Sequence, residues 1–304
     1  MGLLNRLQAI FQTKELDVSK RFELLREAIT GTMSQFFVAR DIESGKVVGL
    51  KLLDREKTLQ FEARFKGLKK PSEGEIASSI KHPLVVDTFE YGTTTTGQPY
   101  LVMEFLKGTN LHLLILNRDP IIKARRTKLV CQMAEAIEAV HKAGFIHRDV
   151  CPRNFIFDPE TDLLKMIDFG LTVPAIKEFM QAGNRTGTPQ YMSPEVVRRR
   201  PTDQRLDIFS FGVSAYQICA FELPWPSSET TGKVALAHDT HPPVNIFEVF
   251  PNLEKKLGEL IMRCIDPRPN QRPQDMSAVV RVARKVVFEE QAGSTAVPPA
   301  KPSP

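Results

Sequence analysis

Alternation of apolar and polar residues dominates the first third of the chain and predicts β-strands. Apolar runs over Gln35–Arg40 and Val47–Leu53 flank a turn sequence at Glu43–Gly45, which is a hairpin signal. A second turn at Gly92–Gly97 precedes the apolar run Tyr100–Phe105. This part of the chain is therefore expected to form an antiparallel sheet.

After Gly108 the apolar positions recur at helical spacing. Helices are predicted over Arg126–Lys142, Asp207–Phe221 and Leu253–Cys264. A strand-rich segment followed by a helix-rich one predicts an α+β protein with two lobes that join near residues 104–108.

The two ends of the chain differ from the middle. Residues 1–20 are expected to form an amphipathic extension, because an apolar stripe at helical spacing runs through residues 1–14 (Leu3, Leu4, Leu7, Ile10 and Phe11). Such a stripe favours packing on its own domain over binding to a membrane or partner, although docking of a partner through this helix or the tail stays open. The Pro- and Ala-rich segment 291–304 is expected to be disordered.

Composition changes this picture little. The formal net charge of +5 over 304 residues is too small and too evenly spread to indicate nucleic-acid binding. The four cysteines lie far apart and lack the spacing of a metal site, which favours reduced thiols. With no signal peptide or apolar span of membrane length, the expected location is the cytoplasm.

Two polar clusters, each beside apolar runs, carry the candidate chemistry. The first is His147-Arg148-Asp149-Val150-Cys151-Pro152-Arg153-Asn154, and the second, fourteen residues beyond Asn154, is Asp168-Phe169-Gly170. Phosphoryl transfer from ATP needs Mg²⁺ between phosphates and a base that orients the acceptor hydroxyl. Asp149 suits the base, and Asn154 and Asp168 suit the metal.

In this order, the two clusters resemble the catalytic loop and the D-F-G motif of the eukaryotic-type protein kinase family. The resemblance extends from about Phe22 to Val287. It implies a bilobal kinase fold over residues 21–290, with the small lobe at 21–104 and the large lobe at 108–290. It also implies ATP and Mg²⁺ as cofactors and protein substrates, with no role for nucleic acid.

The resemblance assigns Lys51 to the strand lysine that holds the α- and β-phosphates. Its ion-pair partner on the next helix is expected to be Glu73, with Glu75 as the rival. Gly74 between them weakens the helix. The catalytic set implied is Asp149, Lys51, Asn154 and Arg153.

The same resemblance implies the residues that surround the nucleotide. Met103 corresponds to the gatekeeper, and adenine would bond backbone groups of Glu104 and Leu106. The complete expected set is Ile29, Gly31, Ser34, Phe36, Gly49, Lys51, Glu73, Met103, Glu104, Leu106, Ile156 and Asp168.

Two departures from the family pattern concern the phosphates. Only Gly31, the middle glycine of the glycine-rich loop, is kept, with Ile29 and Ser34 where the others belong. Glycines there let backbone N–H groups approach phosphate. Cys151 replaces the lysine of Ser/Thr kinases, and Arg153 stands where tyrosine kinases place an arginine that could supply the missing cation.

The segment Gly187-Thr188-Pro189 is similar to that of Ser/Thr kinases and favours this specificity, although the catalytic loop alone resembles tyrosine kinases. Glu195 is expected to pair with Arg272, and Asp207 to cap the catalytic-loop backbone. Arg148 suggests a phosphorylated activation segment, with Thr186 favoured over Thr172 as the acceptor.

Two functions from different classes remain. The first is an active Ser/Thr protein kinase, which the presence of Lys51, Asp149, Asn154 and Asp168 favours. The alternative is a pseudokinase, a nucleotide-binding scaffold without turnover, which the altered glycine loop and Cys151 favour.

Overall fold

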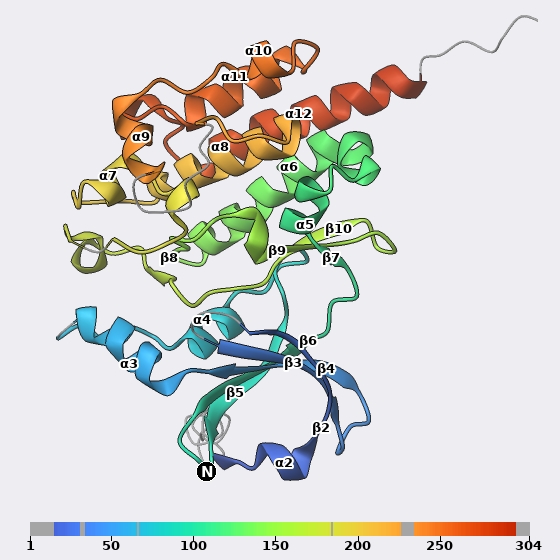
Figure 1. Ribbon diagram of the computed structural model, residues 1–304, viewed down its shortest axis with the longest axis vertical. Helices are drawn as coiled ribbons and strands as arrows, with labels where there is room; N and C mark the ends of the chain where they lie inside the picture. Colours follow the sequence, from blue (N-terminus) through green and yellow to red (C-terminus); the bar gives the residue numbers. More distant parts are fainter. Residues whose placement is uncertain (1–14, 31–33, 66, 184, 226–233, 296–304) are drawn as a thin grey trace, which may run out of the picture. The chain divides into compact units, whose positions relative to one another are not determined.

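The computed structural model describes residues 15–30, 34–65, 67–183, 185–225 and 234–295. These residues form two compact units, one ending at Lys107 and the other beginning at Gly108 (Figure 1). The predicted junction at 104–108 coincides with this division. The apolar stripe of residues 1–14 and the prediction made for Gly31 lie outside the described residues.

The first unit is a six-stranded sheet with helices. Its elements are β1 (Glu15–Leu16), α2 (Val18–Arg21), β2 (Phe22–Thr30), β3 (Ser34–Asp41), β4 (Val47–Leu53), α3 (Arg55–Glu62), the 3-10 turn η1 (Ala63–Phe65), α4 (Glu73–Ser79), β5 (Thr88–Thr94) and β6 (Pro99–Glu104). The strand order is β1-β5-β6-β4-β3-β2, antiparallel throughout except for the parallel pair β1–β5. The predicted hairpin is β3–β4, and the predicted strand at Tyr100–Phe105 is β6.

One difference from expectation is at the start of this unit. Residues 15 and 16 fall within the expected amphipathic extension, yet they form β1, which pairs with Thr93 and Thr94 of β5. Leu16 is buried in the same apolar cluster as Phe22 and Tyr100, and this burial stabilises the strand.

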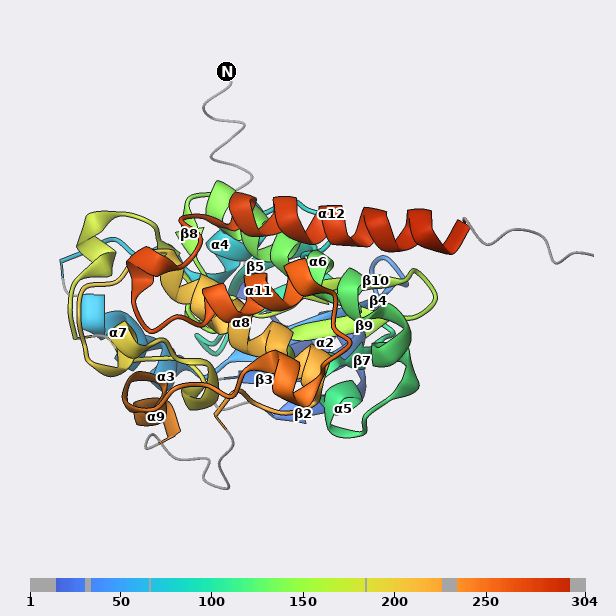
Figure 2. The same cartoon turned by 90° about the horizontal axis from the view of Figure 1, so that it is seen from above.

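The second unit is mainly helical. Its elements are β7 (Thr109–Asn110), α5 (Leu111–Leu116), α6 (Pro120–Lys142), β8 (Phe145–Ile146), η2 (Pro152–Asn154), β9 (Phe155–Asp158), β10 (Leu163–Met166), β11 (Val173–Pro174), η3 (Lys177–Met180), η4 (Pro189–Tyr191), α7 (Pro194–Val197), α8 (Arg205–Ala220), α9 (Val234–Thr240), α10 (Ile246–Val249), α11 (Lys255–Cys264), η5 (Pro269–Gln271) and α12 (Met276–Thr295). The three predicted helices correspond to α6, α8 and α11. Figure 2 shows α12 alongside α6.

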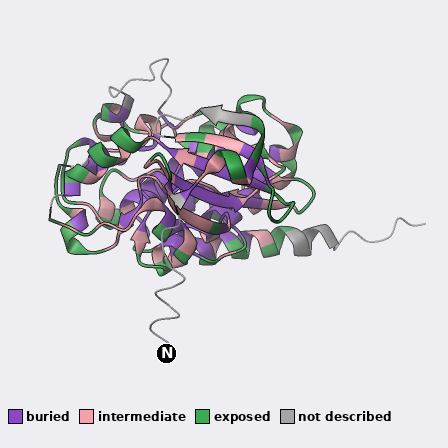
Figure 3. Ribbon diagram, turned by 90° about the horizontal axis from the view of Figure 1, so that it is seen from below, coloured by how far each residue is buried: buried purple, intermediate pink, exposed green. Residues whose placement is uncertain are grey.

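Helix α8 is the centre of this unit's core. Almost every one of its side chains is buried, and Figure 3 shows how buried and exposed residues are distributed over the elements. A helix that is apolar on all sides needs cover on all sides. Here α6, α10 and α11 supply contacts, and this rigid core carries the loops described below.

The end of α12 also differs from expectation. The tail was expected to lack structure from residue 291, but the helix continues to Thr295. The segment up to Thr295 contains no proline, and the first helix-breaking proline is Pro298. Among the residues described, no helix combines the length and apolar character needed to cross a bilayer.

Candidate active site

In the first unit, an ion pair joins the sheet to helix α4. The Lys51 ammonium on β4 lies 2.5 Å from Glu73 Oε1 on α4, and both side chains are more than 90% buried. Glu75, the rival, is used elsewhere: it forms a capping box with Ser72, whose hydroxyl accepts from the Glu75 N–H. The start of α4 therefore fixes which glutamate faces the sheet.

Helix α4 approaches the sheet closely because Gly74 has no side chain. A Cβ at this position would lie 2.4 Å from Tyr91 Cβ on β5, well inside contact distance. The glycine that weakens the helix in isolation is thus what allows Glu73 to reach Lys51.

The other expected nucleotide-site residues of this unit lie on neighbouring strands. Phe36 pairs with Lys51 across the β3–β4 ladder and with Ile29 across β2–β3. A Cβ on Gly49 would meet the Phe36 ring at 2.7 Å and Met103 Cγ at 3.0 Å, so these side chains close over the glycine. Ser34 begins β3, beside Leu53.

The segment expected to bind adenine follows β6. Glu104 ends this strand, and both its N–H and its carboxylate are used internally: the N–H donates to the Asp87 carbonyl, and Oε1 accepts from the Asp87 N–H. Met103 is buried, and Leu106 lies two residues beyond the strand, half-buried.

In the second unit, Asp149 is held from two sides. Its Oδ1 accepts hydrogen bonds of 2.8 Å from both the backbone N–H and the hydroxyl of Thr188. Asn154 Nδ2 donates to the Asp149 carbonyl at 2.7 Å and to Oδ2 at 3.1 Å. An ionised carboxylate offers about four acceptor positions. The two bonds from Thr188 and the one from Asn154 to Oδ2 use three of them, so Oδ2 can accept one more.

A buried carboxylate on α8 fixes the backbone of this loop. Asp207 accepts hydrogen bonds of 2.8 Å from the N–H groups of His147 and Arg148 and is in contact with His141 Nε2 at 2.8 Å. Burial alone would raise the pKa of Asp207, but the hydrogen bond with His141 and the charges around it hold that pKa below its usual value. Arg148 has a φ of 69°, a left-handed conformation that these bonds stabilise.

Asp168 lies next to Asn154 through strand pairing. In the β9–β10 ladder Met166 is opposite Phe155, and the Ile167 N–H extends the ladder to the Asn154 carbonyl at 3.0 Å. Asp168 then follows, with Oδ1 accepting from the Gly170 N–H at 2.8 Å. Ile156 lies on β9 opposite Lys165.

These residues fit a magnesium ion shared with a nucleotide. Asn154 turns its Nδ2 to Asp149, and no described residue donates to its Oδ1, which is thus able to bind a cation. Within the described ranges no group of three or more His, Cys, Asp or Glu forms a self-contained metal site. Mg²⁺ in nucleotide sites needs only one or two protein carboxylates, because phosphates and water complete its shell.

Comparison with known proteins agrees with this arrangement. Residues 22–283 match the family model of the protein kinase domain. The chain belongs to the protein kinase domain family. Serine/threonine-protein kinase pkn3 of Myxococcus xanthus is 32% identical over 266 residues, covering 82% of this chain and 46% of that protein.

Other kinases are similar at comparable levels. Serine/threonine-protein kinase PknB of Mycobacterium tuberculosis is 29% identical over 84% of this chain and 41% of its own length. Serine/threonine-protein kinase pkn2 of Myxococcus xanthus is 30% identical over 84% of this chain and 31% of its own length. The chain therefore spans from a third to a half of the length of these relatives.

The kinase domain also has the expected link between its activation segment and its helical core. Arg272, whose side chain is fully buried, forms a bidentate pair with Glu195 at 2.7 and 2.9 Å. The predictions for this pair and for Asp207 are both confirmed. Thr186 has a buried hydroxyl without a hydrogen-bond partner among the described residues, and Thr172 is fully buried.

Cys151, the main departure of this kinase domain, is buried with 1% exposure. Its Sγ lies 3.7 Å from Thr188 Oγ1. Burial, and secondly the charge of Asp149, raise the pKa of Cys151 to about 12. The thiol is therefore neutral at pH 7 and supplies no cation for phosphate.

Arg153 is exposed, and its backbone carbonyl accepts from Asn110 Nδ2 at 2.7 Å. Burial lowers the pKa of His112 on α5, and the charge of Arg153 lowers it further. The pairing of Thr188 with Asp149 was missed from the sequence. The sequence contains the segment Gly187-Thr188-Pro189, but only the fold brings Thr188 next to Asp149.

Proposed function

We propose that this chain is an ATP- and Mg²⁺-dependent protein kinase that phosphorylates Ser and Thr hydroxyls of proteins. The observation that carries the proposal is the setting of Asp149. Its carboxylate is fixed by Thr188 and Asn154 yet keeps acceptor capacity on Oδ2. That is what a group needs in order to orient an acceptor hydroxyl and take its proton.

Each remaining residue has a role that its position supports. Bound Mg²⁺ would bridge the phosphates and neutralise the charge that develops during transfer. Asn154 Oδ1 and the Asp168 carboxylate would hold it. Lys51, oriented by Glu73, would hold the phosphates as a point charge. Arg153 would supply a second cation near the acceptor, a role that Cys151 cannot take because a cysteine side chain is never cationic.

Selectivity for Ser and Thr is supported by the hydrogen bonds of Thr188. The Thr188 side chain and backbone both bind Asp149, so the segment after Gly187 forms the wall beside the base. A Cβ on Gly187 would lie 2.8 Å from the Arg148 carbonyl, and its φ of 118° also requires glycine. The segment is therefore closely fixed against the loop. The relatives named as serine/threonine kinases add support.

A pseudokinase remains the second candidate, and Cys151 is the specific observation that favours it. One experiment separates the two. The protein is incubated with γ-labelled ATP, Mg²⁺ and a generic basic protein, beside the variants Asp149→Asn and Lys51→Met. We expect transfer that both variants abolish. Equal background labelling with all three proteins would favour the pseudokinase scaffold.

A further inference from the structure

His238 on α9 is a buried polar residue that is none of those assigned to phosphoryl transfer. Its side chain is 2% exposed, and its Nδ1 lies 2.7 Å from the Met192 carbonyl oxygen. Because a carbonyl oxygen can only accept, Nδ1 must carry the proton. Burial lowers the pKa of His238, so the imidazole is neutral at pH 7 and this is its one ring proton. The contact is therefore a hydrogen bond of fixed direction, from His238 to the backbone of Met192.

Two aromatic rings hold the His238 imidazole in this orientation. The centroid of the Trp225 ring lies 4.5 Å from that of the imidazole, and the Phe209 centroid lies 5.5 Å away. The Trp225 indole is itself fixed, since its Nε1–H donates to the His241 carbonyl at 2.9 Å. The Arg272 guanidinium in turn lies 4.9 Å from the Phe209 ring centroid. The imidazole is thus packed into the core around α8 and has little freedom to turn.

The Met192 carbonyl ends a short turn that begins beside the catalytic loop. Thr188, which binds Asp149 through its backbone and its hydroxyl, accepts at its carbonyl from the Tyr191 N–H at 2.9 Å. The Met192 N–H donates to the Pro189 carbonyl at 3.3 Å. The turn η4 is therefore held at both ends, at its start by the proposed base and at its end by the imidazole of α9.

The surface of this turn is the part of the described chain that a protein substrate would meet beside the base. The acceptor hydroxyl must lie within hydrogen-bonding reach of Asp149, so the residues that flank the acceptor lie over the adjoining segment. Pro189 and Gln190 are partly exposed there, whereas Tyr191 and Met192 are buried. The turn thus offers a small surface whose position depends on buried neighbours.

Helix α9 holds the same part of the chain at a second point. Arg198, directly after α7, pairs with Asp239, and Figure 1 shows α9 beside α7. His238 and Asp239 therefore contact the chain on both sides of α7. The Arg198 side chain is 44% exposed, so its ion pair contributes little, and the buried hydrogen bond from His238 is the stronger anchor.

We propose that His238 is a positioning residue for the protein substrate. Through the Met192 carbonyl it holds the surface of Pro189 and Gln190 in the position that receives the chain around the acceptor Ser or Thr. The inference rests on the proposed function and deepens it, because it assigns a residue on α9 to substrate binding.

Steady-state kinetics of full-chain variants test this role, with a basic protein as the varied substrate and ATP at saturation. His238→Asn keeps a donor, since its amide nitrogen can take the place of Nδ1. His238→Gln carries its amide one methylene further out, near the place of Nε2, and His238→Leu has a similar size without a donor. The matched control is His241→Leu, because His241 has the same chemistry but an exposed side chain.

We expect the KM for the protein substrate to rise about fivefold or more in His238→Gln and His238→Leu, which is the effect of one buried hydrogen bond. His238→Asn should stay within about twofold of wild type, and so should His241→Leu. Either the Gln or the Leu variant suffices if the other fails to fold. If both fail to fold, the role of His238 is structural and the proposal is overturned.

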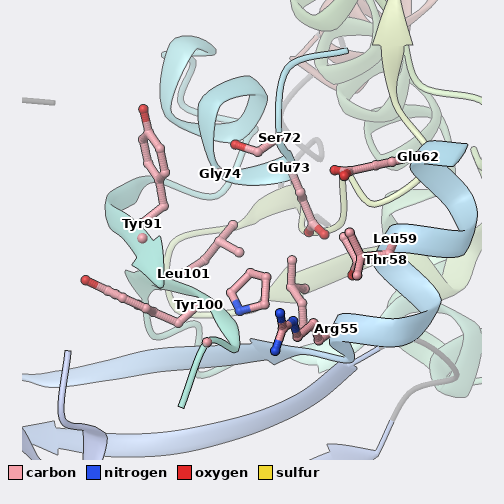
Figure 4. Close-up of a pocket in the computed structure, with 14 residues that line it drawn as sticks. Arg55, Thr58, Leu59, Glu62, Ser72, Glu73, Gly74, Tyr91, Tyr100 and Leu101 are labelled. Atoms are coloured by element: carbon pink, nitrogen blue, oxygen red, sulfur yellow. The ribbon is translucent and has the colours of Figure 1, made fainter. Parts of the chain in front are cut away.

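The KM for ATP separates positioning of the substrate from general loosening of the protein. Lys51, the proposed phosphate cation, is oriented by Glu73, which Figure 4 shows at the cavity between α3, α4 and the sheet of the first unit. His238 and its contacts belong to the second unit, so the KM for ATP should not change in any variant.

Three results would overturn the proposal: an equal rise in both KM values, a fall in kcat with unchanged KM for the protein substrate, or equal KM values in the Asn, Gln and Leu variants of His238. A wild-type protein that transfers no phosphate would refute the proposed function and this inference with it. An active wild type whose KM for the protein substrate is unchanged in His238→Gln and His238→Leu would refute this inference alone.

Discussion

Substitution of Gly74 by alanine tests whether the close approach of α4 to the sheet positions Glu73. The new Cβ would lie 2.4 Å from Tyr91 Cβ and 2.5 Å from Tyr91 Cγ, and Tyr91 Cβ cannot move away without moving the strand. Relief to ordinary contact at about 3.5 Å needs a shift of about 1 Å. Such a shift would lengthen the 2.5 Å contact between Lys51 and Glu73 beyond hydrogen-bonding range.

The stability change is expected to be small, because two effects oppose each other. Overpacking costs about 1–3 kcal/mol, and replacing a helical glycine by alanine returns about 1 kcal/mol. The activity change is expected to be larger. We predict a loss of at least about tenfold in kcat/KM for ATP, equivalent to about 1.4 kcal/mol of transition-state stabilisation.

The assay compares steady-state kinetics and thermal unfolding of Gly74→Ala with two controls. Ser79→Ala introduces the same residue on an exposed face of α4 and should behave as wild type. In a Glu73→Gln background the Gly74 substitution should cost little more, since the ion pair is already lost. Activity of Gly74→Ala within twofold of wild type would refute this explanation of the glycine.

Three further tests concern other parts of the protein. Cys151→Ala should keep kcat/KM within about threefold of wild type, because a neutral buried thiol supplies no charge. Arg153→Ala should lower kcat/KM about tenfold or more. A larger loss in Cys151→Ala than in Arg153→Ala would contradict the role proposed for Arg153. Arg272→Ala should destabilise the protein by about 3–5 kcal/mol in denaturant unfolding, since it leaves a buried carboxylate unpaired. Arg268→Ala removes an exposed pair and should leave stability unchanged; equal losses would contradict the burial argument. Asp207→Asn should cost most stability near pH 7. The folded-state pKa of Asp207 is lowered, so its contribution is complete above the unfolded value of about 3.9 and is lost as the pH falls through the folded value. A stability difference that stays constant down to pH 2 would show that this ionisation contributes nothing.

Much of the fold follows from local pattern. The hairpin β3–β4 and the helices α6, α8 and α11 each carry their own periodicity, so the sequence predicts them without knowledge of distant contacts. The start of α4 was also within reach, because Ser72 and Glu75 have capping-box spacing, which uses Glu75 and leaves Glu73 for Lys51.

The contacts that could not be predicted from the sequence join residues that are far apart along the chain. The contact of Gly74 with Tyr91 forms only when α4 packs on β5. Helix propensity alone indicates only that this glycine weakens the helix. The same holds for Thr188, which lies 39 positions from Asp149 and meets it through two hydrogen bonds. Strand β1 is another case, since two residues carry too little pattern to predict pairing with β5.

The most direct test of the central claim is the chemical identity of the phosphorylated residue. Wild-type protein and Asp149→Asn are incubated with γ-labelled ATP and Mg²⁺ alongside a basic protein substrate, and the labelled substrate is hydrolysed for phosphoamino-acid analysis. We expect phosphoserine and phosphothreonine with wild type and neither with the variant. Label on tyrosine, or wild-type label no higher than that of Asp149→Asn, would contradict it.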